Sequence, residues 1–446
     1  MTSSEELFKK DDQYFAKAGR IPYYKLIVDH AHGSTIVDKD GKEYIDLLTS
    51  ASALNVGHTP EKVVNAIKEQ TDKMIHYTPA YMYHEPVIHL SERLANLSPG
   101  NFEKKVSFGL SGSDANDAVI KFSRAYTGRK NIVSFVGAYH GSTYGSLSMS
   151  AISLNMRRKM GPFVPGMHHI PFPDSYRGLY GSVEPNTVEE YLAPFQNMLD
   201  NYLPTDEIAA VVVETLQGDG GLLKPVKGYM KALYDFCKEN GILFVVDDVQ
   251  QGLGRTGKWS SIEHFEGVEP DMIVYGKSLA GGLPLSAVVG RKEVMDSLDA
   301  PAHLFTTAAN PVSCAASLAT LDMLEEDDLL NESTRKGNIA EERMNQWKER
   351  FDFVGDVRGL GLSLGIDIIS DGENKTKDPE SALKICNRLF ERGVVMISFA
   401  GSVLRFQPPL VITDDELDWV LTTMEETFEE LEAGKLKDYD VANQGW

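Results

Sequence analysis

The sequence has few cysteines and no long hydrophobic run. Its 446 residues contain three cysteines, Cys237, Cys314 and Cys386, which lie far apart in the chain. An odd number at such wide spacing favours neither a disulfide framework nor a metal site of the CxxC type, so we expect no metal centre. No stretch approaches the roughly 18 consecutive apolar residues of a membrane span, and the first residues lack the apolar core of a secretory signal. These absences indicate a reducing, cytoplasmic environment.

Basic residues are also in deficit. The chain has 44 Lys and Arg against 65 Asp and Glu, which gives a formal net charge of −21. Such a chain repels both phosphate backbones and anionic lipid surfaces, so we exclude nucleic acids and membranes as partners and expect a small-molecule substrate. The length suggests roughly three domains at about 150 residues each, although α/β folds often place about 250 residues in one domain.

Short apolar runs alternate with helical stretches through the middle of the chain. The runs are Ile132–Val136, Ala209–Val213, Ile242–Val246, Met272–Tyr275 and Ser286–Val289. Because these runs are continuous rather than alternating, they predict strands that are buried on both faces, as in parallel sheets. An amphipathic helix is predicted over 228–240, between two of the runs. The pattern predicts an α/β fold with a large domain built on a mostly parallel sheet.

The two ends of the chain have a different pattern. A charged helical stretch is expected over 315–351 and a polar loop over 370–378. A strand near 394–397 and a last helix ending near Glu432 follow. We expect residues 1–55 and 331–446 to form a smaller α+β domain, and residues 56–330 to form the large domain.

Two glycine motifs resemble nucleotide-binding loops but lack their context. Gly252–Gly257 matches G-x-G-x-x-G, yet no apolar helix face follows it, and Asp247 before it would repel a pyrophosphate. Residues 276–278 resemble the end of a Walker A loop, but Asp271 stands where that motif needs glycine. We therefore exclude both kinds of nucleotide site.

Two charged residues directly follow or close predicted strands. Lys277 follows a buried strand in a small-residue setting, where burial lowers the pKa of an amine and makes it a nucleophile toward an aldehyde. The alternative is a lysine that reaches solvent. Asp247 closes another strand and needs a cationic partner. That partner is either the protonated ring nitrogen of pyridoxal phosphate (PLP) or an arginine such as Arg255.

Two further segments at strand ends suit the same ligand. Ser111-Gly112-Ser113-Asp114 precedes a helical stretch, and the free amides there suit a phosphate; the alternative is an ordinary serine cap. Tyr139 follows another strand, where its side chain would stack on a ligand ring; the alternative is an ordinary core tyrosine. Open α/β sheets bind ligands at the carboxyl edge of their strands, so we expect these features to meet there.

In these segments the chain resembles the class III, fold-type I PLP enzymes, the family of ornithine and 4-aminobutyrate aminotransferases. The resemblance runs from Asp38–Asp46 through Gly57–Pro60 to Leu404–Leu410, and its most specific part is Asp247–Gly257 followed by Gly276-Lys277. It implies fold type I and pyridoxal 5'-phosphate as the cofactor.

The resemblance also implies a role for each matching residue. Lys277 would form the Schiff base with the cofactor and shuttle the Cα proton. Asp247 would pair with the ring nitrogen, Gln250 would bond the phenolic oxygen and Tyr139 would stack on the ring.

Other matching residues would bind the cofactor phosphate and the substrate. Gly112 and Ser113 would hold the phosphate, and Thr306 would reach the phosphate of a partner subunit. A homodimer, or a dimer of dimers with shared active sites, is therefore implied. Arg405 would bind the α-carboxylate of an amino-acid substrate in a bidentate manner.

Departures from the aminotransferase pattern point to a different reaction. Residues 214–221 read E-T-L-Q-G-D-G-G, with Asp219 where the family has a glutamate that gates an arginine, and the family's T-F-G-G-N-P motif is altered at 306–311. The strings at 50–58, 75–81, 217–221 and 301–306 resemble the amino-acid racemases built on this scaffold.

The sequence is compatible with three functions. The first is racemisation or epimerisation at Cα of a non-polar amino acid such as isoleucine, with Lys277 and Asp219 as acid/base groups on opposite faces. Alternatively, Asp219 merely pairs with Arg405. The second is a class III aminotransferase acting on ω- or α-amino acids. The third is a catalytically silent binding protein. The intact Lys277, Asp247 and Gln250 argue against it, because a protein that only binds would not need a complete electron sink.

Overall fold

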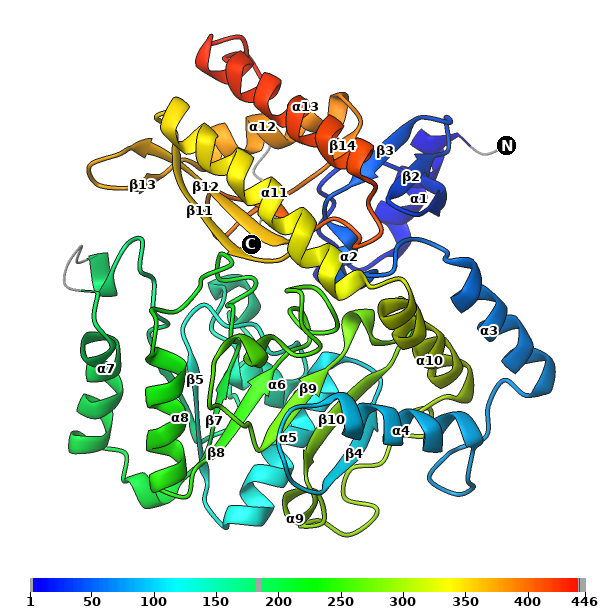
Figure 1. The fold of residues 1–446 in the computed structure, drawn as a ribbon, viewed down its shortest axis with the longest axis vertical. Helices are drawn as coiled ribbons and strands as arrows, with labels where there is room; N and C mark the ends of the chain where they lie inside the picture. The colour runs from blue at the N-terminus through cyan, green and yellow to red at the C-terminus, as the bar shows by residue number, and fades with distance from the viewer. Residues whose placement is uncertain (1–2, 182–185, 440, 442–446) are drawn as a thin grey trace.

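A seven-stranded sheet forms the centre of the larger part of the molecule (Figure 1). The structure is a computed structural model that describes residues 3–181, 186–439 and 441. In spatial order the strands are β4 (Lys104–Gly109), β10 (Ser286–Arg291), β9 (Met272–Tyr275), β8 (Leu243–Asp247), β7 (Ile208–Val213), β5 (Asn131–Phe135) and β6 (Met167–Ile170).

The sheet is mostly parallel, as the apolar runs predicted, with one exception. Strand β10 runs antiparallel to both of its neighbours, β9 and β4. The expectation that Ser286–Val289 is another parallel strand is therefore wrong. A continuous apolar run reports burial on both faces and not direction, and the connection over 276–285 is shorter than the dozen or so residues of a parallel crossover. The edge strands β4 and β6 were not predicted because polar residues interrupt them.

Helices cover both faces of this sheet. Neighbouring residues of β7 belong to separate core clusters: Val211 and Val213 pack with α8 (Tyr229–Glu239), whereas Val212 packs with α5 (Gly112–Thr127). The other helices of this part are α3 (Glu61–Lys73), α4 (Glu85–Leu97), α6 (Tyr144–Met149), α7 (Val188–Asn201), α9 (Lys292–Met295) and α10 (Pro311–Glu326).

Segments from both ends of the chain share one sheet above the larger part (Figure 1). Its strands are β1 (Val28–His32), β2 (Thr35–Asp38), β3 (Glu43–Asp46) and β14 (Val394–Val395), and β14 runs parallel to β3. The N-terminal strands therefore join the C-terminal part, although boundaries near residues 55 and 330 stay a prediction. Helix α1 (Ser4–Tyr14) precedes this sheet, and α2 (Thr49–Ser52) is a left-handed turn that follows it.

A second C-terminal sheet faces the larger part of the molecule. Its strands, in order, are β11 (Val354–Leu360), β12 (Ser363–Asp371), β16 (Val403–Phe406) and β15 (Ser398–Phe399), with β13 (Thr376–Lys377) beside β12. The accompanying helices are α11 (Leu329–Arg350), α12 (Pro379–Glu391) and α13 (Asp414–Glu432), so the last helix ends where the sequence predicted.

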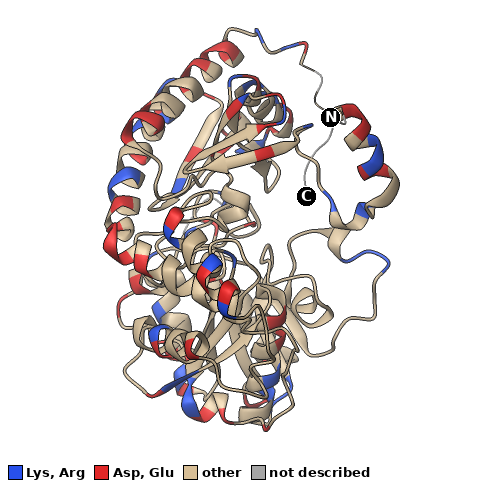
Figure 2. Ribbon diagram, turned by 90° about the vertical axis from the view of Figure 1, so that its right-hand side faces the viewer, with Lys and Arg blue, Asp and Glu red and all other residues tan. Residues whose placement is uncertain are grey.

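The predicted helical stretch over 315–351 is two helices. Asp328 has a φ of 51°, a left-handed conformation that ends the turn after α10 and precedes α11. Charged residues of both signs lie along the outer helices (Figure 2). Among the described residues, no helix is both long and apolar enough to cross a membrane. All three cysteines are buried and unbridged.

Candidate functional site

Five strand ends of the central sheet surround one cavity of about 200 Å³. The segments that follow β4, β5, β7, β8 and β9 all contribute to its wall. Seven of the residues singled out in the sequence line it: Gly112, Ser113, Tyr139, Asp219, Asp247, Gln250 and Lys277. The carboxyl edge of the parallel strands is therefore where these residues meet, as expected.

Asp247 is buried at the end of β8, where neutral and basic groups contact its carboxylate. Its Oδ2 atom accepts hydrogen bonds from Asn116 Nδ2 at 2.8 Å and contacts His140 Nδ1 at 2.7 Å. Its Oδ1 atom accepts from the Val249 amide at 3.1 Å. The alternative pairing with Arg255 is wrong, because that guanidinium lies elsewhere and donates to Asn55 Oδ1 at 2.7 Å.

His140 and Asn116 are site residues that the sequence analysis missed. Burial alone would lower the pKa of His140, but its hydrogen bond to Asp247 and that group's charge outweigh this effect and raise the pKa. Asn116 is on α5, one turn past Ser113, and bridges to Asp247 across 131 residues of sequence. The only local signal for His140 was its position beside Tyr139. The His140 Nε2 and Asn116 Oδ1 atoms are buried without a hydrogen-bond partner among the described residues.

Glu214 is a second buried carboxyl group in this wall. Its Oε1 atom accepts from the Tyr139 amide at 3.0 Å, and its Oε2 atom accepts from the Gly218 amide at 2.7 Å. Burial raises the pKa of Glu214 to about 7. The carboxyl group thus ties the segment after β5 to the loop after β7, a role that the strand-end motif alone did not reveal.

Lys277 follows β9 directly and begins the short 3₁₀ turn η6 (Lys277–Ala280). Its φ of 45° lies in the left-handed region, which is uncommon outside glycine and turns the side chain off the strand direction. Within the part of the chain that the structure describes, its amine makes no hydrogen bond or ion pair. Burial lowers the pKa of this amine, although the Asp219 charge opposes the effect. This is the environment that the sequence predicted for a nucleophilic lysine.

Asp219 and Arg405 form a buried ion pair beside the cavity. Burial alone would raise the pKa of Asp219, but the charges of Arg405 and Lys277 hold it below its ordinary value. The Arg405 guanidinium also lies over the Phe399 ring, 4.1 Å from its centre. The pairing with Arg405, which the sequence left as the alternative, is therefore present, and it keeps the Asp219 carboxylate charged.

Gln250 completes this side of the cavity. Its Nε2 atom lies 3.5 Å from Asp219 Oδ1, and its Oε1 atom accepts from Gln251 Nε2 at 3.0 Å. A Cβ at Gly218 would come within 2.3 Å of Gln250 Oε1, so a side chain at Gly218 would displace the glutamine.

The N-terminus of α5 opens into the same cavity. Ser111 caps the helix and forms a capping box with Asp114, so the ordinary capping interpretation holds for Ser111. Gly112 and Ser113 follow it in the first turn and line the cavity. Ser113 Oγ accepts a hydrogen bond from the Ser142 amide at 3.0 Å. Free amides at the start of a helix of this length are suited to bind a phosphate.

Thr306 lies apart from the cavity. Its side chain is exposed, and its carbonyl accepts from His76 Nε2 at 3.1 Å. Its predicted contact with a partner subunit's phosphate stays a prediction, as do the individual roles of the other site residues.

A model of the family described as aminotransferase class-III matches residues 15–428. The chain belongs to the class III aminotransferase family, and its mostly parallel central sheet with a smaller C-terminal part is the fold-type I architecture expected from the sequence.

Similar proteins include both racemases and a transaminase. Isoleucine 2-epimerase of Lentilactobacillus buchneri is 52% identical over 447 residues, covering 100% of this chain and 99% of that protein. Leucine/methionine racemase of Thermococcus litoralis is 42% identical, covering 97% of each. An amine transaminase from an uncultivated Pseudomonas species, solved in its PLP-bound form, has a TM-score of 0.84 at 28% identity and covers 91% of this chain and 95% of its own.

Family membership and the PLP-bound neighbour imply pyridoxal phosphate as the cofactor, and the residues present fit it. The cavity has a helix N-terminus for a phosphate at one end. It has a buried carboxylate for a protonated ring nitrogen, Asp247, and the Lys277 amine, which has no partner among the described residues, for an aldehyde.

Proposed function

We propose that this protein is a PLP-dependent amino-acid racemase that inverts Cα of non-polar amino acids and converts L-isoleucine to D-allo-isoleucine. The observation that carries the proposal is that two opposite kinds of acid/base group, the Lys277 amine and the Asp219 carboxylate, line one cavity. Relatives named as an isoleucine epimerase and a leucine/methionine racemase, which match nearly the whole chain, support it.

Inversion needs proton removal on one face of Cα and proton delivery on the other. The bound cofactor supplies an electron sink that makes the Cα–H bond acidic. Lys277, whose pKa is lowered by burial, is the group that takes or returns the proton on its own face. Asp219 serves the opposite face, directly or through a water molecule. Asp247 keeps a positive ring nitrogen charged, and His140 and Asn116 hold that carboxylate in place.

Arg405 is the group that binds the substrate's α-carboxylate in this proposal. One of its guanidinium nitrogens binds Asp219, while its Nε atom is buried and has no hydrogen-bond partner among the described residues. A buried donor without a hydrogen-bond partner favours binding of a ligand that carries an acceptor, because an unsatisfied buried donor costs free energy. The same guanidinium can therefore orient the substrate and hold Asp219 beside Cα.

The alternative function is a class III aminotransferase acting on an ω- or α-amino acid, which the family match supports. A transaminase stores the amino group on its cofactor and needs a keto acid to complete a cycle. A racemase needs none. The two functions therefore differ in their requirement for a second substrate.

We further propose a cytoplasmic homodimer, or a dimer of dimers. Five apolar or aromatic side chains between α3 and α4 are exposed, with Tyr83 at 95%. They are Ile75, Tyr77, Tyr81, Met82 and Tyr83. An exposed patch of this kind is typical of a protein–protein interface. The exposed Thr306 lies near it through His76 and is available to a neighbouring subunit.

Incubation of the holoenzyme with L-isoleucine in D2O, without any keto acid, tests the function. We expect D-allo-isoleucine that carries deuterium at Cα, because the delivered proton comes from a group in exchange with solvent. A keto acid formed in an amount equal to the enzyme, without catalytic inversion, would instead establish the aminotransferase.

A further inference from the structure

Two arginines occupy one row of the C-terminal sheet. Arg358 on β11 lies opposite Gly365 on β12, and Gly365 lies opposite Arg405 on β16. Residues directly opposite each other in antiparallel strands have their side chains on the same face. Both guanidinium groups therefore leave the sheet on one face, separated by a residue that has no side chain.

Both arginines bind the segment Gln217–Leu223, which we name the Asp219 loop. Arg405 binds the Asp219 carboxylate, and Arg358 Nε donates to the Gly221 carbonyl at 2.9 Å. A Cβ at Gly221, whose φ is +124°, would lie 3.2 Å from Arg358 Nη2, so the backbone approaches this guanidinium closely. The two contacts are two residues apart in the loop and come from one row of the sheet.

The Asp219 loop is closed by backbone hydrogen bonds between Gln217 and Leu223, and contacts from outside fix its position in the site. It contains glycine at 218, 220 and 221, and glycine restricts the backbone less than any other residue. Gln217 Nε2 donates to the Val136 carbonyl at 2.9 Å, and Glu214 accepts from the Gly218 amide, so the first half of the loop is tied to the central sheet. Arg358 binds the second half, beyond Asp219, where the buried Leu222 side chain also packs with Phe399 and Val403.

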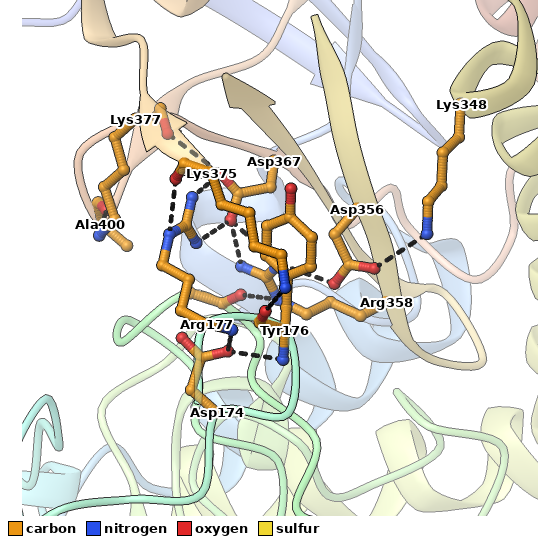
Figure 3. A network of polar contacts seen from close by, with 12 residues as sticks. Asp174, Tyr176, Arg177, Lys348, Asp356, Arg358, Asp367, Lys375, Lys377 and Ala400 are labelled. Atoms are coloured by element: carbon orange, nitrogen blue, oxygen red, sulfur yellow. Dashed lines mark hydrogen bonds and ion pairs between the residues drawn. The ribbon is translucent and has the colours of Figure 1, made fainter. Parts of the chain in front are cut away.

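Arg358 is itself fixed by acidic neighbours (Figure 3). Its Nη1 atom lies 3.0 Å from Asp356 Oδ2 and 3.1 Å from Asp367 Oδ2. Asp367 is fully buried and also receives two hydrogen bonds from Arg177, at 2.6 and 2.9 Å. A guanidinium held by carboxylates in this way is a rigid support, because its planar donors are already oriented.

We propose that Arg358 is a positioning residue that, together with Arg405, holds the Asp219 loop so that the Asp219 carboxylate faces the substrate side of the cavity opposite Lys277. This inference rests on the proposed function, since proton delivery by Asp219 is what the positioning serves. Loss of Arg358 leaves proton exchange on the Lys277 face intact and weakens delivery on the other face.

Arg177 provides a matched control for Arg358. Both arginines bind Asp367, and either substitution leaves that carboxylate one arginine partner. Arg177 also donates to the Lys375 carbonyl at 3.2 Å, and its hydrogen bonds do not reach the Asp219 loop. Arg358→Met and Arg177→Met therefore each remove one arginine from Asp367. Arg358→Met also removes a partner of Asp356 and the contact at Gly221, whereas Arg177→Met removes the contact with Lys375.

The first test measures inversion against retention in D2O with L-isoleucine and with D-allo-isoleucine as separate substrates. For the substrate whose proton faces Lys277, Arg358→Met should lower the ratio of inverted to retained deuterated product about tenfold, the size expected for one lost hydrogen bond from a charged donor. Arg177→Met should keep the wild-type ratio. An unchanged ratio in Arg358→Met, or an equal fall in both variants, overturns the proposal.

The second test needs no catalysis. Amide hydrogen exchange of the holoenzyme, read in peptides that span 214–223, should be about tenfold faster in Arg358→Met, because the opening of this segment loses one strong contact. The Arg177→Met variant should exchange like the wild type. Unchanged exchange in Arg358→Met overturns the positioning role. If the wild-type enzyme fails to invert isoleucine, the proposed function falls, while this comparison still decides whether Arg358 holds the loop.

Discussion

Asp247 and Lys277 leave the ends of the neighbouring strands β8 and β9, whereas Asp219 lies in a glycine-rich loop beyond β7. The first two residues take their positions directly from the central sheet. Asp219 takes its position from Arg405, and its loop from Glu214 and Arg358, which come from both parts of the molecule. The cofactor side of the site is thus fixed by the central sheet alone. The proton-delivery side is fixed by contacts between the central sheet and the C-terminal sheet.

This difference has a chemical consequence. A cofactor ring must stay in one place through many turnovers, and buried strand ends provide that rigidity. The group that delivers a proton to the second face determines which reaction follows proton removal. In this protein that group depends on long-range contacts, so changes in the loop should alter the reaction while changes at the strand ends should abolish it.

The largest effect is expected for Lys277→Ala. Loss of the amine should lower both inversion and Cα deuterium exchange by at least about 10³-fold, since a general base contributes roughly 10² to 10⁴ and the attachment of the cofactor is lost as well. Proton NMR of isoleucine in D2O measures both rates. Lys292→Ala, which removes an exposed lysine on α9, is the matched control and should keep wild-type rates. Substantial exchange by Lys277→Ala would show that another residue is the base.

Asp219→Asn should have a smaller and more selective effect. Inversion should fall by about 10² to 10⁴, the usual contribution of one acid/base group. The absorbance of the lysine-bound cofactor should be unchanged, because Lys277 is intact. Chiral chromatography of the products and a visible spectrum give the two readouts. The control is Asp235→Asn on the exposed face of α8. Inversion at the wild-type rate in Asp219→Asn would show that Asp219 is not the second acid/base group.

Glu214→Gln should have the smallest effect, and one that depends on pH. The pKa of about 7 lies above the ordinary 4.5, so the folded protein retains a proton that the unfolded chain releases. Stability of the wild type therefore falls as pH rises from 4.5 to 7, whereas glutamine has no such dependence. The difference in Tm between wild type and variant, positive at pH 5, should shrink by about 2 °C or more at pH 8. A constant difference would mean that Glu214 is charged in the fold throughout.

The sequence predicted the strand-end half of the site because its signals are local. Lys277 and Asp247 come straight after apolar runs, and parallel strands bring such positions to one edge. Asn116 and His140 were missed because their contact with Asp247 depends on how α5 and the segment after β5 lie over the end of β8. No local pattern reports that packing.

The loop half could be predicted only in part. Asp219 stood out as a departure from a family motif, but the row of Arg358, Gly365 and Arg405 exists only in the pairing of three strands. The direction of β10 escaped prediction for the same reason, since an apolar run shows burial and not orientation. The part of the site that decides the reaction, the Asp219 loop with its arginines, is therefore the part that depends on strand register and packing.

The face-specific exchange of the Asp219→Asn variant tests the central claim most directly. The variant is incubated in D2O with L-isoleucine and D-allo-isoleucine separately, and deuterium at Cα is measured in the recovered substrate. Our account predicts exchange with retention for one of the two substrates, the one whose proton faces Lys277, and nearly none for the other. Equal exchange of both substrates would contradict the assignment of Lys277 and Asp219 to opposite faces of Cα.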